Sequence, residues 1–379
     1  MTQTRKRIFI SALEPSAELH CANLMQQCNQ KAAEPIDWVG FGGEKMQQLN
    51  CAVLENTVGK AAMIYNVFGQ IGYYRSLIRL ARLSLSENKP DLVVVCDSPA
   101  FNFHIAKAAK KLGIPVLFYV APQLWAWAPW RIGKLRKCCD KLACILPFEQ
   151  RWFQRRGVDA EFVGNPLFDE LDGPVENNLK TYTGYLPENA KIALLPGSRK
   201  AEIESLWLPM QQIAVQIRNR YPDARFFTAA PDMSKMVLLH QHRLAGFSCL
   251  EQIGGLMDLC KQVDLAIVAS GSATLQVAAA GCPMIVMYQS SRLIWQLVGR
   301  WLIRTPHLSL PNIIAGRKLV PEYMPYFTSI EPIVDTAMGY LNNTERLQKA
   351  SADLIELVKP LAGRNTADRI AEIILKMVQ

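Results

Sequence analysis

Residues 191–204 read KIALLPGSRKAEIE, and the character of this stretch changes at Pro196 and Gly197. The residues before them form a nearly continuous apolar run, which is typical of a strand buried on both faces of a parallel sheet. The residues after them, from Ser198 and Arg199 onward, have the character of an opening helix. The stretch therefore predicts a β-strand that passes through a tight turn into a helix N-terminus.

The same alternation of strand and helix continues on both sides of this stretch. The other strand-like runs are, in chain order, RIFISAL, WVGFGG, DLVVVCD, PVLFYVAP, KLACILP, AEFVGN, ARFFTAA, LAIVAS and PMIVMY. Apolar strands that alternate with helices predict parallel sheets covered by helices on both faces. The expected fold class is therefore α/β, with two Rossmann-like, doubly wound domains that face each other across a cleft.

Length and turn composition predict the domain boundaries. At 379 residues the chain exceeds the size at which one hydrophobic core usually stops growing. We expect a first domain at 1–170, a linker rich in polar residues, Gly and Pro at 171–189, and a second domain at 190–350. The last helices, at 351–379, could pack back on the first domain.

Composition argues against several classes of protein. Half of the residues are hydrophobic and 20% are charged, so a disordered chain is excluded. The ten cysteines are scattered without a CxxC pair, which favours reduced thiols in the core over disulfides or a metal site. The start, MTQTRKRI, lacks the apolar segment of a signal peptide, and no apolar run reaches the ~18 residues that span a bilayer. We therefore expect a cytoplasmic location.

The formal net charge of +9 favours an anionic partner. Nucleic acid, an anionic membrane surface and a phosphorylated substrate all fit such a charge. No helix-turn-helix, RNA-binding motif or zinc-finger spacing is present, so no nucleic-acid partner is expected.

Two turns of the second domain are candidates for a nucleotide site. Gly197, Ser198 and Arg199 stand where a helix opens, and backbone N–H groups beside an arginine suit a diphosphate. The other turn lies within 268–288, where small residues allow close approach of a phosphate or ribose: Ser270, Gly271, Ser272, Ala273 and Thr274. Either turn alone also fits an ordinary capped helix, but two of them in one domain favour a nucleotide pocket.

Two carboxylates of the first domain are candidates for acid–base chemistry. Asp97 ends the apolar run DLVVVCD, and Glu14 follows the first strand. A carboxylate at the carboxyl end of a buried strand opens on the cleft and could take a proton from an acceptor hydroxyl. Either acid could instead cap a helix or pair with a basic residue.

Seven segments, in this order, resemble the lipid-A-disaccharide synthases, a glycosyltransferase family with the GT-B fold of two Rossmann-like domains. The segments are LEPSAELH at 13–20, CDSPAFNF at 96–103, YVAPQLWAWAPWRIGKLRK at 119–137, ILPFEQRWFQRRGVDAEFVGNPLFDEL at 145–171, LLPGSRKAEIE at 194–204, ASGSATLQVAAAGCPMIVMY at 269–288 and LSLPNIIAGRKLVPE at 308–322. Together they cover nearly the whole chain and are far more specific than any one motif.

The resemblance implies transfer of 2,3-diacylglucosamine from its UDP derivative to 2,3-diacylglucosamine 1-phosphate, which yields the β-1,6-linked lipid A disaccharide and UDP. It implies no metal ion and no other cofactor. Asp97 matches the essential aspartate of the family and Arg199 its essential arginine. Asn312 and Arg317 match a motif on the donor side, and Glu14 falls on the glutamate of the amino-terminal loop.

The chain departs from the family pattern at six positions that usually carry Gly, Asp, His or Glu: Leu13, Ala17, Glu18, Ala100, Asn165 and Gln276. The last of them bears on the donor. An acid at that place typically holds the ribose hydroxyls in GT-B transferases, and an amide binds them less strongly than a carboxylate. Asp97 and Arg199 are retained, which argues against simple decay of the active site.

The resemblance also implies lipid partners. We expect UDP-diacylglucosamine, diacylglucosamine 1-phosphate and the inner face of the cytoplasmic membrane, where the protein would be peripheral; a homodimer is left open. Two stretches combine apolar and aromatic residues with arginines, 61–85 and 292–305, and are candidates for membrane contact. The first also fits an ordinary helix whose apolar stripe faces the core.

A third stretch, WAWAPWR, combines tryptophans with a basic run. We expect Trp125, Trp127 and Trp130 to pack in the interior, whereas the basic residues behind them face either the acceptor phosphate or solvent.

Two other functions fit the same residues. One is a different GT-B enzyme for a UDP-sugar, either a transferase for another acceptor or a UDP-N-acetylglucosamine 2-epimerase. The other is a membrane-associated binding protein that kept the fold and lost turnover, which Ala17, Ala100, Asn165 and Gln276 would fit.

Overall fold

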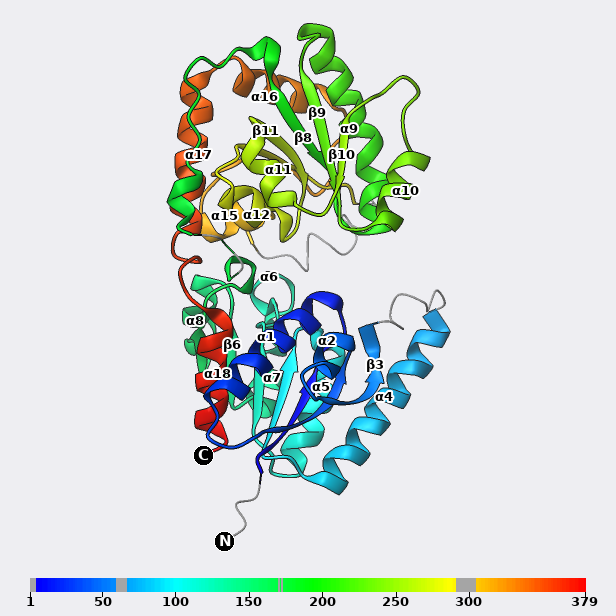
Figure 1. The fold of residues 1–379 in the computed structure, drawn as a ribbon, viewed down its shortest axis with the longest axis vertical. Helices are drawn as coiled ribbons and strands as arrows, with labels where there is room; N and C mark the ends of the chain where they lie inside the picture. Colours follow the sequence, from blue (N-terminus) through cyan, green and yellow to red (C-terminus); the bar gives the residue numbers. More distant parts are fainter. Residues whose placement is uncertain (1–4, 59–66, 170, 172, 291–304) are drawn as a thin grey trace. The chain divides into compact units, whose positions relative to one another are not determined.

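The computed structural model describes residues 5–58, 67–169, 171, 173–290 and 305–379. The chain divides into two compact units, Met1–Glu170 with Gly363–Gln379, and Leu171–Ala362. Each unit is an α/β domain built on a parallel sheet (Figure 1). The α/β, doubly wound fold class predicted from the sequence is therefore confirmed for both units.

The first unit contains a seven-stranded sheet in the order β3-β2-β1-β4-β5-β6-β7. Its strands are β1 (Arg7–Ser11), β2 (Asp37–Gly42), β3 (Ala52–Asn56), β4 (Leu92–Cys96), β5 (Val116–Tyr119), β6 (Lys141–Cys144) and β7 (Ala160–Phe162). All residues of β4 are buried because helices cover both faces of this strand, as its unbroken apolar run predicts. The strand order reverses between β1 and β4, and ligands bind at such switch points, outside the carboxyl ends of the strands.

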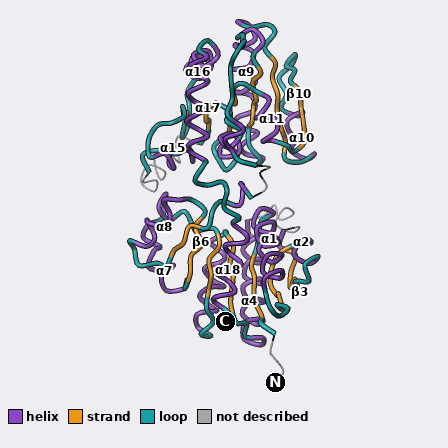
Figure 2. The backbone as a smooth tube through the Cα atoms, turned by 60° about the vertical axis from the view of Figure 1, so that its left-hand side comes forward, coloured by secondary structure: helices purple, strands orange, loops and turns teal. Residues whose placement is uncertain are grey.

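The helices of the first unit lie on both faces of this sheet (Figure 2). They are α1 (Pro15–Lys31), α2 (Glu44–Gln47), α4 (Val67–Asn88), α5 (Pro99–Lys111), α6 (Leu124–Trp127), α7 (Ile132–Cys138), α8 (Pro147–Gln154) and α18 (Thr366–Met377), with short 3-10 helices η1 (Pro129–Arg131) and η2 (Pro166–Phe168). Because crossovers between parallel strands are right-handed, α1 covers one face and α4, α5 and α7 the other. Within that second group, α4 contacts α5, and α5 contacts α7.

The C-terminal helix α18 belongs to the first unit and lies beside α1 (Figure 1). Its Ile370 and Ile374 are buried in the same core as β1 and β4. The carboxylate of Asp169 accepts hydrogen bonds from the backbone N–H and the hydroxyl of Thr366, at 3.0 and 2.8 Å. The helix therefore completes the core of a unit that began some 360 residues earlier in the chain.

The second unit contains a six-stranded parallel sheet in the order β10-β9-β8-β11-β12-β13. Its strands are β8 (Lys191–Leu195), β9 (Arg225–Ala230), β10 (Leu250–Ile253), β11 (Leu265–Ala269), β12 (Met284–Met287) and β13 (Glu322–Tyr323). Its helices are α9 (Lys200–Arg220), α10 (Met233–Gln241), α11 (Leu256–Gln262), α12 (Ala273–Ala279), α15 (Leu310–Ala315), α16 (Glu331–Leu341) and α17 (Thr344–Val358), with 3-10 helices η3 (Val175–Asn178) and η4 (Pro187–Asn189). Here the switch point lies between β8 and β11.

The segment 171–189, which we expected to be a linker, is part of the second unit. Tyr182 is buried in the core of that unit, and the backbone N–H of Lys180 donates to the hydroxyl of Ser351 in α17 at 3.0 Å. The boundary after the second unit falls at Ala362, so α17 also belongs to it.

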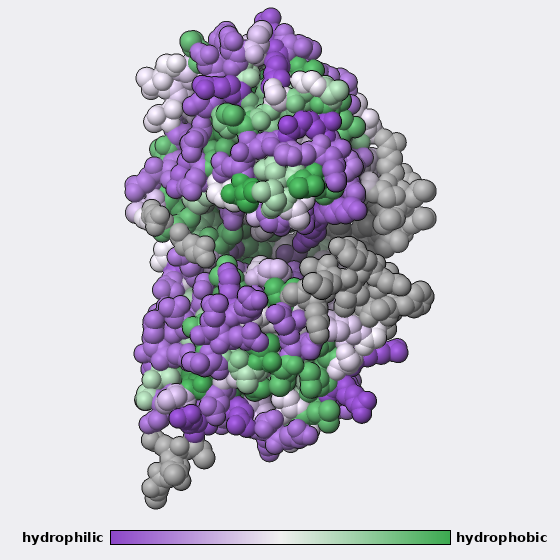
Figure 3. Space-filling view, turned by 45° about the vertical axis from the view of Figure 1, so that its right-hand side comes forward, coloured by the Kyte–Doolittle hydropathy of each residue, from purple (hydrophilic) through white to green (hydrophobic). Residues whose placement is uncertain are grey.

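Hydrophilic residues predominate on the surface seen in Figure 3, with smaller apolar groups between them.

Candidate functional site

The carboxyl end of β4 carries backbone strain. Asp97 and Ser98 follow this strand with φ values of +51° and +41°, in the left-handed region that non-glycine residues rarely adopt. The neighbouring strand β5 is followed by Val120, at φ +62°, where a β-branched side chain is especially unfavourable. Each such residue costs about 1–3 kcal/mol, and strain of this kind gathers at functional sites. The adjacent ends of β4 and β5 therefore mark a candidate site that includes Asp97.

The side chain of Asn102, at the start of α5, holds this turn. It is fully buried, and its Nδ2 donates to the carbonyls of Cys96 and Asp97 at 3.0 and 2.8 Å. Its Oδ1 accepts from the hydroxyl of Ser11 in β1 at 2.8 Å. The backbone N–H of Asp97 in turn donates to the carbonyl of Tyr119 at 3.0 Å. These bonds tie the half-buried Asp97 to both neighbouring strands.

Glu14 lies at the same edge of the sheet. It directly precedes α1 with an extended backbone, and it is exposed. A hydrogen bond with Cys21, burial, and the charges of Cys21, Asp97 and Glu14 raise the pKa of the Cys96 thiol. Strands β1 and β4 pair in register, with Ser11 opposite Val95, so Glu14 and Asp97 follow neighbouring strands at the same edge of the sheet. This is the switch point between β1 and β4.

Glu202 organises the turn between β8 and α9 in the second unit. Its Oε2 accepts from the backbone N–H groups of Ser198 and Arg199, at 3.1 and 3.2 Å. Its Oε1 lies 2.8 Å from the guanidinium of Arg199, whose side chain is 76% exposed. Gly197 has φ +102°, and a Cβ there would lie 2.4 Å from Glu202 Oε2, so only glycine fits. The amides and arginine predicted to hold a diphosphate are thus assembled, and they hold a carboxylate of the chain itself.

The second predicted turn lies next to the first one. Strands β8 and β11 pair in register, with Leu195 opposite Val268, so both turns leave the same edge of the sheet. The turn is tightened by Thr274, whose buried hydroxyl donates to the carbonyl of Gly271 at 2.7 Å. Ser272 is exposed, and four other predicted residues are half-buried at this edge: Ser270, Gly271, Ala273 and Gln276. The structure therefore brings these residues to the switch point of the second unit.

Asn312 shapes a loop. Its side chain is fully buried, and its Oδ1 accepts from the backbone N–H groups of Leu319 and Val320 at 2.7 and 2.8 Å. Its Nδ2 donates to the carbonyl of Val320 and to Glu322, at 3.0 and 2.9 Å. Arg317, in contrast, is 62% exposed and lies 4.0 Å from Asp353. Of the two residues predicted on the donor side, Arg317 therefore remains accessible, whereas the amide of Asn312 is occupied by the chain.

Glu322 closes the same loop, a role that we did not predict. Its Oε2 accepts from the backbone N–H and the hydroxyl of Ser309, at 3.0 and 2.6 Å. Burial alone would raise the pKa of Glu322, but hydrogen bonds from Ser309 and Asn312 outweigh it and lower this pKa. The carboxylate therefore stays ionised and pins the segment between α15 and β13.

Four residues at which the chain departs from the family pattern, Leu13 among them, are buried in the interior. Ala17 and Glu18 are buried, and Glu18 accepts from the backbone N–H of Lys45 at 2.9 Å. Asn165 is buried and caps η2 by accepting from the backbone N–H of Leu167 at 3.1 Å. Ala100, at the start of α5, is exposed.

The tryptophans of WAWAPWR differ in burial. Trp125 is buried, and its Nε1 donates to Glu149 at 3.0 Å. Glu149 also accepts from the backbone N–H of Leu146 at 3.0 Å, and burial raises its pKa to about 7. Trp127 and Trp130 are 37% and 58% exposed. The prediction of interior packing is therefore confirmed for Trp125 and wrong for the other two.

The two stretches predicted to contact membrane lie partly outside the described residues, which exclude 61–66 and 292–304. Within α4, Leu77, Ala81 and Leu85 are buried, so this part of the helix packs on the core. No helix in the described ranges is long and apolar enough to cross a bilayer. Among the same residues, no cluster of three or more His, Cys, Asp or Glu side chains could hold a metal ion.

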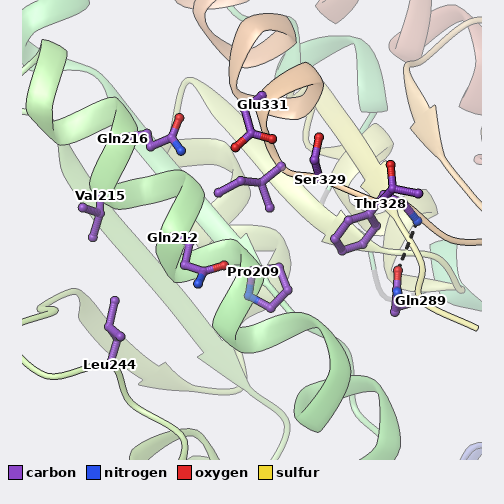
Figure 4. Close-up of a pocket in the computed structure, with 11 residues that line it drawn as sticks. Pro209, Gln212, Val215, Gln216, Leu244, Gln289, Thr328, Ser329 and Glu331 are labelled. Carbon is purple, nitrogen blue, oxygen red and sulfur yellow. Dashed lines mark hydrogen bonds between the residues drawn. The ribbon is translucent and has the colours of Figure 1, made fainter.

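A pocket of about 680 Å³ lies elsewhere in the second unit, between α9 and the segment 327–331 (Figure 4). It combines apolar side chains with the amides of Gln212, Gln216 and Gln289, and the last of these accepts from the backbone N–H of Phe327 at 3.1 Å. None of the residues predicted from sequence is among its described lining residues. We therefore assign the candidate site to the strand ends.

Comparison with known proteins supports one family. The family model described as lipid-A-disaccharide synthetase matches residues 8–378. The lipid-A-disaccharide synthase of Geobacter sulfurreducens is 32% identical over 382 residues, which cover 99% of this chain and 98% of that protein.

Similar solved structures have low sequence identity. UDP-GlcNAc 2-epimerase from Neisseria meningitidis, bound to UDP-GlcNAc, has a TM-score of 0.64 at 12% identity and covers 98% of this chain and 100% of that one. MurG from Acinetobacter baumannii has a TM-score of 0.54 at 12% identity, with 98% and 99% covered. At this identity, these similarities show a common fold.

Proposed function

Because the chain belongs to the lipid-A-disaccharide synthase family of glycosyltransferases, we propose that it transfers 2,3-diacylglucosamine from its UDP derivative to 2,3-diacylglucosamine 1-phosphate. The products are the β-1,6-linked disaccharide and UDP. The observation that carries the donor side is the turn of Ser198 and Arg199, where two backbone N–H groups and a guanidinium already surround a carboxylate. The diphosphate of the UDP-sugar is also an anion, so it suits the same N–H groups and guanidinium.

On the donor side, the diphosphate of the UDP-sugar would take the place of the Glu202 carboxylate. The guanidinium of Arg199 cannot lose its charge, and charge-assisted hydrogen bonds from it stabilise the negative charge that develops as UDP leaves. Gln276 and the small residues of the turn after β11 would then contact the ribose. Arg317, an exposed cation of its loop, is assigned to the same side.

On the acceptor side, Asp97 would act as the general base. It takes the proton from the 6-hydroxyl as this oxygen forms a bond to the anomeric carbon and the bond from that carbon to UDP breaks. Glu14 supplies a second carboxylate at the same edge of the sheet and, together with Asp97, would orient the acceptor. The hydrogen bonds of Asn102 to the turn restrict the position of Asp97, which favours a productive geometry.

We further propose that the protein works as a peripheral protein on the inner face of the cytoplasmic membrane, because both substrates carry acyl chains. All the catalytic residues named above come from one chain, so the proposal needs no second copy. It also needs no metal ion, since Arg199 and the amides supply the positive charge.

The test is to incubate the purified protein in detergent with both diacylated substrates and to detect the disaccharide by mass spectrometry, with UDP release measured in parallel. Disaccharide that forms equally well with and without EDTA supports the proposal. Conversion of non-acylated UDP-N-acetylglucosamine to its 2-epimer, or UDP binding without any product, would contradict it.

A further inference from the structure

Three neighbouring helices of the first unit carry almost only positive charge. Helices α4, α5 and α7 together contain nine Lys and Arg residues and a single acid, Glu87. The nine are Arg75, Arg79, Arg82, Lys107, Lys110, Lys111, Lys134, Arg136 and Lys137. Among the residues that the structure describes, Lys110 alone of these nine forms an ion pair, with Asp140 at 2.6 Å. The other eight side chains form no ion pair with a described residue.

Cations from all three helices affect the pKa of one residue, His104. Burial, and then the charges of Lys134, Arg82 and Lys107, lower the pKa of His104 on α5. Those three cations come from α7, α4 and α5, respectively. The positive charge is therefore concentrated on one face of the sheet.

The opposite face of this sheet is different, because most of the charged side chains described on α1 and α18 are paired. On α1, Lys31 lies 2.6 Å from Asp368 of α18. Arg369 of α18 pairs with Glu161 and Glu372, at 2.7 and 2.8 Å. The positive charge of the first face is thus a property of α4, α5 and α7 and not of the whole unit.

Exposed tryptophans adjoin the basic helices. Trp130, in η1 directly before α7, is 58% exposed, and Trp127 is 37% exposed. The guanidinium of Arg131 lies 5.2 Å from the ring centroid of Trp127. On α4, Tyr74 is 40% exposed and packs at 5.6 Å from the ring of Phe101 in α5. Large aromatic side chains beside cations are typical of the headgroup layer of a bilayer.

We infer that this basic face, formed by α4, α5, η1 and α7, docks on an anionic phospholipid surface with Trp130 inserted among the headgroups. The inference rests on the proposed function only in that the substrates of that reaction are lipids. A bilayer is favoured over a nucleic acid because the aromatic residues lie on helices beside the charges and no nucleic-acid-binding motif is present. An anionic leaflet attracts basic residues close to its surface, each of which strengthens binding about five-fold.

The test is co-sedimentation of the purified full chain with vesicles of phosphatidylcholine, with and without phosphatidylglycerol. The parent protein should bind the anionic vesicles and should bind pure phosphatidylcholine poorly. The double variant Lys134→Gln/Lys137→Gln should bind anionic vesicles roughly 20-fold less tightly. Its matched control is Lys45→Gln/Lys376→Gln, which removes two exposed lysines outside the basic face and should bind as the parent does.

A second variant tests the tryptophan. Trp130→Ala should release the protein at lower salt than the parent, because the remaining attraction is electrostatic and is screened by ions. The apparent melting temperatures of all variants, which change exposed side chains, should match the parent.

Three results would overturn the inference. The first is no binding of the parent to anionic vesicles, and the second is an equal loss of vesicle affinity in Lys134→Gln/Lys137→Gln and in its control. The third is displacement of the protein from vesicles by duplex DNA at equal phosphate concentration. Turnover in detergent is measured separately on each variant. Vesicle binding without turnover would contradict the proposed function and leave the docking face intact. Turnover without vesicle binding would contradict the docking face and leave the proposed function intact.

Discussion

The carboxylate of Glu202 lies 2.8 Å from the guanidinium of Arg199 and also accepts the backbone N–H of the same arginine at 3.2 Å. One acid therefore occupies both the charge and the amide that we assign to the donor. Any diphosphate that binds there has to displace this carboxylate. The strength of donor binding thus depends on how well a phosphate competes with Glu202.

Arg199→Ala should weaken UDP binding by roughly 10-fold or more, because the diphosphate loses a charge-assisted hydrogen bond worth about 1.5–3 kcal/mol. The fold should be retained, since the side chain is 76% exposed. Lys200→Ala is the matched control, because Lys200 is the next residue and its side chain is 74% exposed. Calorimetry of UDP binding gives the answer, and equal affinities for the parent and Arg199→Ala would remove Arg199 from the donor site.

Asp97→Asn should lower turnover by ~100-fold or more, because the amide cannot accept the proton of the acceptor hydroxyl. The fold should survive, since Asn tolerates the positive φ of this position better than most residues. Turnover with saturating substrates is the measurement, together with the apparent melting temperature. Turnover within a few-fold of the parent would mean that Asp97 is not the base.

Asn102→Leu should lower kcat while the affinity for UDP stays unchanged, because Asn102 positions Asp97 in the first unit and the UDP turns lie in the second. The substitution also leaves buried carbonyls unpaired, which costs about 1–3 kcal/mol of stability. Asn29→Leu is the control. Asn29 accepts a hydrogen bond of 2.9 Å from Trp38, and neither residue belongs to the turn that contains Asp97. If both variants lose stability and kcat to the same degree, Asn102 has no specific link to Asp97.

The stability of the parent should contain a pH-dependent contribution from Glu149, whose pKa in the folded protein is raised to about 7 from 4.5. The folded state holds this proton more tightly than the unfolded state, so the contribution falls as pH rises from about 4.5 to 7. Its upper limit is about 3 kcal/mol, at 1.36 kcal/mol per pKa unit.

Comparing Glu149→Gln with the parent isolates this contribution, because Gln does not titrate. The variant should be less stable than the parent at pH 5, and the difference in apparent melting temperature should shrink by pH 8. Glu188→Gln changes an exposed acid and should follow the parent at both pH values. A difference that is constant from pH 5 to pH 8 would contradict the raised pKa.

Local patterns in the sequence predicted the turns of the site well. The apolar run before Pro196-Gly197 became β8, and the residues after it became α9, because strand burial and turn chemistry are both local signals. The same logic found Asp97 at the end of β4. Its strain and that of Val120 could not be predicted, because they depend on how β4 and β5 end side by side.

The contacts that hold the site were harder to predict. Asn312 matched a donor-side motif, but its amide is consumed by Val320 and Glu322, partners that only the closed loop brings within reach. Tyr182 lies in a polar segment without periodicity, so its burial in the second core left no signal in the sequence. Trp127 and Trp130 were expected to pack because tryptophan is usually buried, and only the tertiary structure exposes them.

The first unit cannot complete its core until the last helix of the chain has been synthesised. Ile370 and Ile374 of α18 fill the same core as β1 and β4, and the whole second unit is translated between them. A nascent chain therefore leaves the surface of α1 that α18 will cover open to water while residues 171–362 are made and fold. During that interval the exposed α1 surface is a natural target for a chaperone or for aggregation, and shortening the chain by its last helix would make the condition permanent.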